Sequence, residues 1–134
     1  MLPVTFNDVP AECINFAAIA YHVPATLILS ILKTEDGRNG TAKRNANGSY
    51  DYGPFQINSW WLPTLKRFSI TREDIQFNPC INAMVGTWIL VQALTETKFL
   101  PQGVGNYNSH TPHLNQRYSQ QVLRWYRLFN EKAA

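Results

Sequence analysis

The sequence lacks any apolar stretch long enough to cross a lipid bilayer. A membrane-spanning helix needs about 20 mostly apolar residues in a row, and polar residues or prolines interrupt each apolar run here before that length. The first five residues also lack the basic segment that opens a secretory signal peptide. We therefore expect no membrane span, and the chain either stays in the cytosol or begins after a signal that has been removed.

The sequence also lacks a strong excess of either positive or negative charge. Twelve Lys and Arg residues stand against nine Asp and Glu residues, which gives a net charge of +3 and an isoelectric point of about 9.0. The basic residues are scattered, and the only adjacent pairs are Lys43-Arg44 and Lys66-Arg67. This mild basicity suits an anionic polymer, but it is too weak and dispersed to predict nucleic-acid binding.

Cysteine is limited to Cys13 and Cys80, each within a predicted helix. As a pair they would close a long loop and stabilise the fold by about 4 kcal/mol. From the residues alone, two buried thiols are an equal alternative. A disulfide would indicate an oxidising compartment such as the periplasm.

Cofactor motifs, internal repeats and low-complexity linkers are absent. The length of 134 residues predicts one domain, residues 1–134, and 45% apolar content is ample for a single core. His110 and His113 stand in a His-x-x-His arrangement, but no further acid or thiol accompanies them as metal sites require. We therefore predict a loop there, with no metal and no cofactor.

Helical periodicity dominates the first 37 residues. Asn7 or Asp8 is expected to cap a first helix, with Pro10 in its first turn. Residues 22–24 break that helix, and a second apolar helix follows. Gly37 is expected to end the second helix as the residue after its C-cap.

The remaining sequence predicts one hairpin followed by helices. Asn47-Gly48 is a strong hairpin turn signal, and residues 49–52 are expected to form the returning strand, with residues 55–58 leading away from it. The expected helices are a short one capped by Ser59, a turn opened by a capping box from Thr71 to Asp74, a long helix from Asn78-Pro79 to about Thr95, a short one over residues 104–109, and a last one over residues 114–129. The predicted class is α+β, mostly helical, with a small antiparallel β-hairpin beside a helical core.

Two carboxylates frame the segment between the second helix and the hairpin. Glu35 lies in the last turn of that helix, and Asp51 lies on the returning strand. Two acids that face each other across a loop can cleave a glycosidic bond, and partial burial of Glu35 would raise its pKa towards that of a general acid. Amides suited to sugar hydroxyls lie nearby, at Asn45, Asn47, Gln56 and Asn58. A solvated helix-end acid and a turn acid are the ordinary alternatives.

Further segments carry a resemblance to a known family. The segments are the hairpin from Asn45 to Gly53, Gln56-Ile57-Asn58, Trp60-Trp61-Leu62-Pro63, Cys13, the apolar helix ending at Glu35, Asn78-Pro79-Cys80-Ile81-Asn82, Gly86-Thr87-Trp88-Ile89-Leu90, Asn106-Tyr107-Asn108, and Arg117-Tyr118 with Val122. The hairpin is similar to that of animal-type lysozymes. The rest resembles the specialised lytic transglycosylases of type III and type IV secretion and conjugation systems, which belong to the lysozyme-like superfamily.

This resemblance implies roles for particular residues. Glu35 matches the catalytic acid of the family. Gly53 and Gln56 match a Gly-x-x-Gln turn that lines the substrate groove. Tyr107 matches a tyrosine whose hydroxyl points toward the acid, and Asn108 follows it in the same motif. Substrate contacts are therefore expected at these positions and at Asn58, with Asp51 as a second catalytic carboxylate of the lysozyme kind.

The sequence also departs from the family pattern. Asp36 stands where most members have Ser, Asn106 where they have Ala, and Pro54 where they have an aliphatic residue. Asp36 puts in doubt which hydrogen bonds steady the Glu35 carboxyl. Many transglycosylases do without a second acid, so Asp51 is itself informative.

The implied activity is cleavage of the β-1,4 bond between N-acetylmuramic acid and N-acetylglucosamine in peptidoglycan, with a 1,6-anhydro product. The resemblance also implies a Cys13–Cys80 disulfide and hence an exported, periplasmic protein that opens the wall for a secretion or conjugation apparatus. Expected partners are glycan strands and a secretion-apparatus protein, and the chain is expected to be a monomer. The rival functions are a hydrolytic muramidase and a non-catalytic glycan-binding or assembly protein.

Overall fold

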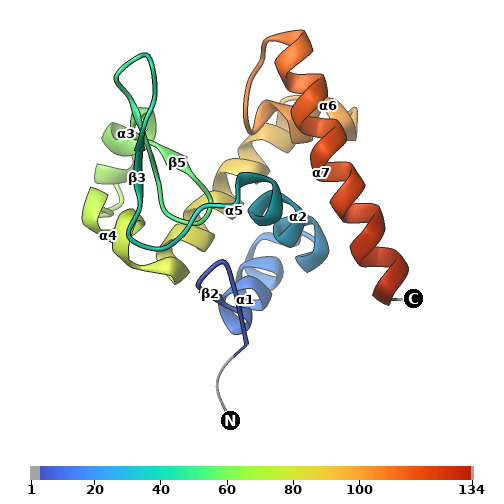
Figure 1. Ribbon diagram of the computed structural model, residues 1–134, viewed down its shortest axis with the longest axis horizontal. Coiled ribbons are helices and arrows are strands. Elements are labelled where there is room, and N and C mark those ends of the chain that lie inside the picture. Colours follow the sequence, from blue (N-terminus) through green and yellow to red (C-terminus); the bar gives the residue numbers. More distant parts are fainter. Residues whose placement is uncertain (1–3, 134) are drawn as a thin grey trace.

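The computed structural model describes residues 4–133 of the chain (Figure 1). The helices are α1 (Ala11–Tyr21), α2 (Ala25–Glu35), α3 (Leu62–Lys66), α4 (Arg72–Phe77), α5 (Pro79–Thr95), α6 (Leu100–Asn106) and α7 (Pro112–Ala133), with a 3-10 turn η1 (Ser59–Trp61). The strands are β1 (Thr5–Phe6), β2 (Val9–Pro10), β3 (Ala42–Arg44), β4 (Tyr50–Tyr52) and β5 (Ile57–Asn58). This confirms the predicted class, mostly helical α+β with small antiparallel sheets.

Helix α5 runs through the middle of the molecule (Figure 1). The β3–β4–β5 sheet lies with α3 and α4 on one side of it, and α6 and α7 lie on the other. The core joins both parts through fully buried residues of α2, α5, α6 and α7, namely Ile28, Ile31, Leu32, Leu90, Val104 and Val122. Each fully buried Leu or Ile side chain stabilises the fold by roughly 1.5–3 kcal/mol relative to exposure.

The N-terminal segment corrects one prediction. Asn7 and Asp8 do not cap α1, because both have positive φ, 49° and 69°, and form the tight turn between the antiparallel strands β1 and β2. Pro10 occupies the N-cap of α1 without a side-chain hydrogen bond. The Asn7 side chain instead donates to Asp36 Oδ1 at 2.9 Å and to the Gly37 carbonyl at 3.0 Å. The first hairpin therefore holds the chain directly after α2.

The end of α2 also differs in detail from the prediction. The left-handed residue is Asp36, with φ 53°, and not Gly37. Gly37 is required for a different reason, because a Cβ there would lie 2.1 Å from the Gly53 carbonyl oxygen. The two backbones approach closely, and the Gly37 N–H donates to the Pro54 carbonyl at 3.1 Å. Helix α2 is thereby joined to the base of the sheet.

The sheet confirms the predicted hairpin and adds a strand to it. Strands β3 and β4 pair antiparallel with Lys43 opposite Asp51, and the turn uses Gly48 at φ 86°. The short segment β5, predicted only to lead away, pairs with β4 and places Asn58 opposite Asp51. Asn58, and not Ser59, then caps η1 by accepting from the Trp60 N–H.

A buried amide fastens the sheet to the helices. Asn82 of α5 is fully buried, and its Oδ1 accepts from the Phe55 N–H at 2.8 Å. Its Nδ2 donates to the Tyr52 and Ile75 carbonyls at 2.9 and 2.8 Å. Gly53 packs against this amide at φ 68°, where a Cβ would lie 2.4 Å from Asn82 Nδ2. These contacts fix the end of β4 at Tyr52, the residue after Asp51.

The later helices follow the predictions with one shift. Thr71 and Asp74 form the predicted capping box, and α5 spans Pro79–Thr95 as expected. Cys13 of α1 and Cys80 of α5 form the disulfide that the resemblance implied, with Cα atoms 5.4 Å apart. The helix expected over residues 104–109 lies earlier, as α6, because Pro101 in its first turn favours a helix start there.

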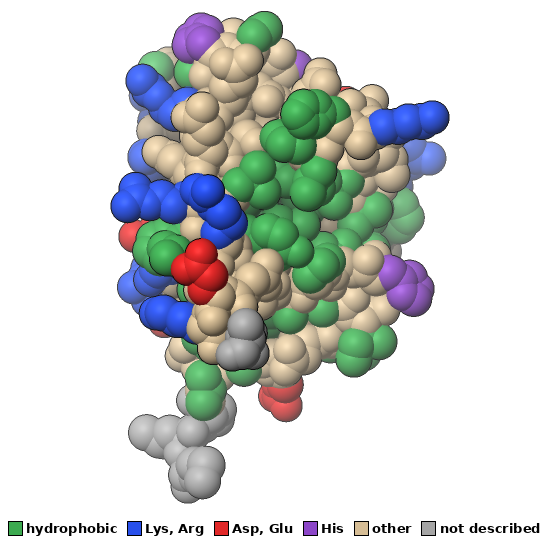
Figure 2. All heavy atoms as spheres, turned by 90° about the vertical axis from the view of Figure 1, so that its right-hand side faces the viewer, with side chains coloured by type: hydrophobic (Ala, Val, Ile, Leu, Met, Phe, Trp, Pro, Cys, Tyr) green, Lys and Arg blue, Asp and Glu red, His purple; other side chains and the backbone are tan. Residues whose placement is uncertain are grey.

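The surface near α7 separates charge from apolar groups. Figure 2 shows most of the Lys and Arg side chains of this face along its left edge, others at its upper right edge, and hydrophobic side chains gathered between them. Arg117, Arg124 and Arg127 are exposed residues of α7. Within residues 4–133, no helix is both long and apolar enough to cross a membrane.

Candidate active site

The carboxyl of Glu35 is held between two helices. Glu35 is the last residue of α2 and is partly buried. The Tyr118 hydroxyl of α7 donates a hydrogen bond to Glu35 Oε2 at 2.6 Å. The two residues are 83 positions apart in the chain, so the packing of α7 on α2 creates this contact.

The environment of Glu35 raises the pKa of its carboxyl to about 7 from an ordinary value of 4.5. Burial is the largest cause, because it disfavours the charged form. The hydrogen bond from Tyr118 opposes that effect, the negative charge of Asp51 adds to it, and the positive charge of Lys43 opposes it. Glu35 therefore holds its proton up to nearly neutral pH, as a general acid must.

Two tyrosine rings lie behind this carboxyl. The rings of Tyr107 and Tyr118 stack with centroids 6.1 Å apart. The Tyr107 hydroxyl donates to the Phe55 carbonyl at 2.9 Å. Burial first, and the charge of Glu35 second, raise the pKa of both phenols well above the ordinary value. Both hydroxyls therefore remain protonated donors at neutral pH.

Asp51 faces the same site from the sheet. It is the middle residue of β4, and its Oδ1 accepts from Asn58 Nδ2 at 2.9 Å. Asn58 Nδ2 also lies 3.1 Å from Ser49 Oγ, so the amide is fixed by two partners. Because the charge of Asp51 raises the pKa of Glu35, the fold brings the two predicted catalytic carboxylates into one electrostatic environment.

The predicted Gly-x-x-Gln turn directly follows β4 and packs against Gly37 after the end of α2. Gly53 is buried and offers no side chain to a ligand. Gln56 is partly exposed, has φ 53°, and donates from Nε2 to the Gly53 carbonyl at 2.9 Å. The structure thus gives Gly53 a packing role and leaves Gln56 Oε1 as the free polar atom of this turn in the described residues.

An aromatic cavity of about 340 Å³ adjoins the tyrosine pair. Trp60, Trp61 and Tyr107 line it together with Asn106 and His110. The Trp60 ring is 71% exposed and stands edge-on to the ring of Trp61 at 4.9 Å between centroids. Exposed rings of this kind suit the C–H faces of sugars.

The remaining predicted residues lie at the edges of the site. Asn108 follows α6 and is exposed, so its predicted contact with substrate stays a prediction. Asp36 accepts from Asn7 and lines a cavity between α2 and α7 with Lys33 and Trp125. Trp125 is partly buried, and Lys33 Nζ lies 5.6 Å from its ring centroid.

Metal-binding groups do not gather in the part of the chain that the structure describes. No three side chains of His, Cys, Asp or Glu within residues 4–133 converge as a metal site would require. His110, one of the two histidines considered above, lies with Nε2 2.9 Å from Glu96 Oε2 at the surface.

Sequence reasoning missed the role of Tyr118. The residue lies on an apolar stripe of α7 with Val122, and the resemblance above includes both residues, but no role in the site was assigned to Tyr118. Its ring is indeed buried, at 7% exposure, while its hydroxyl serves Glu35. A tyrosine on such a stripe needs a partner for its hydroxyl, and that requirement was the available signal.

A helix-end acid with a raised pKa, facing a carboxylate on a small sheet beside a helical core, defines a lysozyme-like protein. The comparison with known families agrees: residues 12–125 match the family described as "Transglycosylase SLT domain". The chain belongs to this family.

Several named relatives are similar over most of the chain. "Invasion protein IagB" of Salmonella typhi is 29% identical over 136 residues, which cover 98% of this chain and 85% of the relative. "Peptidoglycan-binding-like protein" of Escherichia coli O157:H7 is 31% identical over 134 residues, with 90% and 80% coverage. "Protein IpgF" of Shigella flexneri is 28% identical over 121 residues, with 87% and 80% coverage.

Proposed function

We propose that the protein is a peptidoglycan lytic transglycosylase that cleaves the β-1,4 bond between N-acetylmuramic acid and N-acetylglucosamine. The observation that carries this is the environment of Glu35, which raises the pKa of the carboxyl to about 7. Membership of the transglycosylase family supports the reaction class. The name of the Escherichia coli relative supports peptidoglycan as the polymer.

The first step is protonation of the leaving group. The Glu35 carboxyl gives its proton to the glycosidic oxygen, and the bond from that oxygen to C1 of the muramic acid breaks. Positive charge develops at C1 and the ring oxygen. The carboxylate of Asp51, or the acetamido group of the substrate, stabilises this charge electrostatically.

The second step closes the sugar on itself. Glu35, now a carboxylate, removes the proton from the C6 hydroxyl, and that oxygen bonds to C1 to give the 1,6-anhydro ring. Glu35 is thereby returned to its protonated form. The donor from Tyr118 favours the carboxylate while burial favours the acid, so the same residue is suited to both steps.

The setting of the reaction follows from the disulfide and the relatives. The Cys13–Cys80 bond supports an oxidising compartment, and we place the protein in the periplasm. The name "Invasion protein IagB" supports a role in opening the wall locally for a secretion or conjugation apparatus. Glycan strands are then the substrate, and a protein of that apparatus is the partner.

A hydrolytic muramidase is the second candidate, and the position of Asp51 favours it. A second carboxylate on the sheet, close enough for its charge to raise the pKa of Glu35, is typical of enzymes that deliver water to C1. The residues and the first step are the same in both cases. Only the group that attacks C1 differs.

Mass spectrometry of digested peptidoglycan tests the proposal. Anhydro ends, lighter than hydrolysed ends by one water, are expected from the purified protein. Reducing ends would establish the muramidase instead. Absence of any cleavage by a folded protein would leave a glycan-binding or assembly protein, which the name of the Escherichia coli relative also describes.

A further inference from the structure

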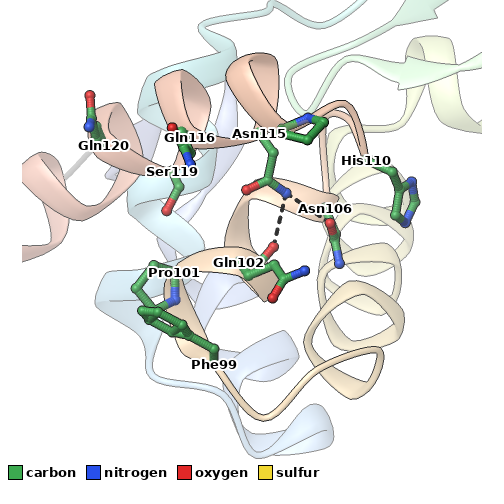
Figure 3. Close-up of a pocket in the computed structure, with 10 residues that line it drawn as sticks. Phe99, Pro101, Gln102, Asn106, His110, Asn115, Gln116, Ser119 and Gln120 are labelled. Carbon is green, nitrogen blue, oxygen red and sulfur yellow. Dashed lines mark hydrogen bonds between the residues drawn. The ribbon is translucent and has the colours of Figure 1, made fainter.

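A second cavity opens between α6 and the first turns of α7. Its volume is about 380 Å³, within the range of small-molecule sites, roughly 300–1,000 Å³. Figure 3 shows Phe99 and Gln102 on the α6 side and Gln116 and Ser119 on α7. We call it the α6–α7 pocket. It does not include Glu35 or Asp51.

Ser119 contributes a hydroxyl to the wall of the pocket. The residue is 4% exposed and lines the cavity. Figure 3 shows its side chain directed from α7 toward the wall that carries Phe99. A hydroxyl can both donate and accept a hydrogen bond, so this group can serve a molecule in the pocket.

The wall next to Ser119 is preformed. Asn115 is 6% exposed, and its Nδ2 donates to the Gln102 carbonyl at 3.1 Å, to Asn106 Oδ1 at 2.8 Å and to the Ser109 carbonyl at 3.0 Å. A Cβ at Gly105 would lie 2.2 Å from Asn115 Oδ1. One amide therefore fixes α6, the connecting loop and α7 relative to one another, and a ligand meets a wall that does not have to reorganise.

The chemistry of the lining identifies the class of ligand. The polar side chains of the lining are amides, one hydroxyl and one imidazole, namely Gln102, Asn106, Asn115, Gln116, Gln120, Ser119 and His110. No Lys, Arg, Asp or Glu lines the pocket within the described residues. The ring of Phe99 is 58% exposed. Neutral donors and acceptors beside an exposed ring suit a sugar that carries hydroxyl and acetamido groups and no charge.

We infer that the α6–α7 pocket is a second glycan-binding site, which takes a neutral N-acetylglucosamine unit of a peptidoglycan strand. The inference rests on the proposed function, since that function supplies the strand. Asn106 and His110 line both this pocket and the aromatic cavity beside Tyr107. A strand that passes the tryptophans therefore reaches the pocket across these two residues. The pocket holds the strand near Glu35 and raises its effective concentration there.

The test is a titration of 15N-labelled Glu35→Gln protein with the β-1,4-linked trisaccharide of N-acetylglucosamine, followed by NMR. We expect saturable shifts of the side-chain amides of Gln102 and Gln116 and of the backbone amide of Ser119. The double variant Gln102→Ala with Gln116→Ala should weaken the binding that Ser119 reports roughly tenfold. Gln116→Ala alone serves if the double variant is not folded. Gln121→Ala, on α7 outside the pocket, should bind as before.

Three results would overturn the inference. Shifts confined to the indole N–H groups of Trp60 and Trp61 would show that sugar binds only the aromatic cavity. Shifts of the pocket amides with a stem tripeptide but not with the trisaccharide would assign the pocket to peptide. Equal weakening by Gln121→Ala would remove its specificity. The outcome is distinct from that of the proposed function, which is decided by cleavage of peptidoglycan with the unaltered protein.

Discussion

The two carboxylates of the site have the same chemistry but stand in different surroundings. Glu35 ends a helix, is partly buried, and receives its hydrogen bond from a phenol on the last helix. Asp51 lies on a short strand and receives its hydrogen bond from an amide on the neighbouring strand. Burial gives the first a pKa of about 7, and the second acts on it as a negative charge.

The difference divides the work between two parts of the fold. The helices provide a shielded position in which the carboxyl of Glu35 keeps its proton, and the sheet provides a negative charge that raises the pKa of that carboxyl. The stacked rings of Tyr107 and Tyr118 pack on the helical side, and the buried amide of Asn82 holds the sheet against α5. The predictions below alter one side of this comparison at a time.

The largest effect is expected from Glu35→Gln. Removal of the general acid should lower the rate of peptidoglycan cleavage roughly 10²–10⁴-fold, measured by loss of turbidity of a peptidoglycan suspension. Asp36→Asn is the matched control, because an Asn oxygen still accepts from Asn7 and Asn tolerates the left-handed conformation. Equal activity of Glu35→Gln and the unaltered protein would remove Glu35 from the mechanism.

The same variant should change stability in a pH-dependent way. Because the pKa of Glu35 is raised from 4.5 to about 7 on folding, the native state binds more protons than the unfolded state between these values, and stability falls as pH rises. At pH 8 this lowers the free energy of unfolding by up to about 3 kcal/mol. Glu35→Gln should therefore be more stable than the unaltered protein at pH 8 and similar at pH 4, by urea denaturation. A stability difference that does not depend on pH would contradict the burial of an acid.

A smaller effect is expected from Asp51→Asn. Loss of the charge should lower the cleavage rate roughly tenfold to a hundredfold. The negative charge of Asp51 raises the pKa of Glu35, so its removal should also move the alkaline limb of the pH–rate profile to lower pH. A reduced rate with an unchanged alkaline limb would show that the charge of Asp51 does not affect the pKa of Glu35.

The smallest effects separate the two tyrosines. Tyr118→Phe removes the hydrogen bond that lowers the pKa of Glu35, so the alkaline limb should move to higher pH, opposite to Asp51→Asn, with less than about a tenfold change in rate. Tyr107→Phe loses only the bond to the Phe55 carbonyl, which should lower stability by about 1 kcal/mol and leave the limb in place. If the alkaline limb of the pH–rate profile moves with Tyr107→Phe and not with Tyr118→Phe, then Tyr107 and not Tyr118 tunes the pKa of Glu35.

Local signals in the sequence predicted most elements. The Asn47-Gly48 turn, the Thr71–Asp74 capping box and the Asn78-Pro79 helix start all act through neighbouring residues, so their structures could be read from short segments. The position of Glu35 at a helix end follows from the same periodicity. The disulfide needed the family resemblance, because spacing alone left two free thiols as an equal alternative.

Contacts between distant segments could not be read in this way. The Tyr118–Glu35 bond and the hydrogen bonds of Asn82 depend on how α7 and α5 pack, which periodicity does not specify. Asn is a residue type that often caps helices, but the pairing of β1 with β2 places Asn7 in a turn instead. Tertiary packing decided between two local structures that the same residue types allow.

The bond from Tyr118 to Glu35 has a consequence for the order in which the site is assembled. The acid belongs to the second helix and its donor to the last one, so a growing chain acquires the carboxyl early and the phenol only near the end of synthesis. Until α7 has docked, the acid lacks its hydrogen bond. The candidate site is therefore completed by α7, and a chain cut short before this helix would carry the acid without its donor.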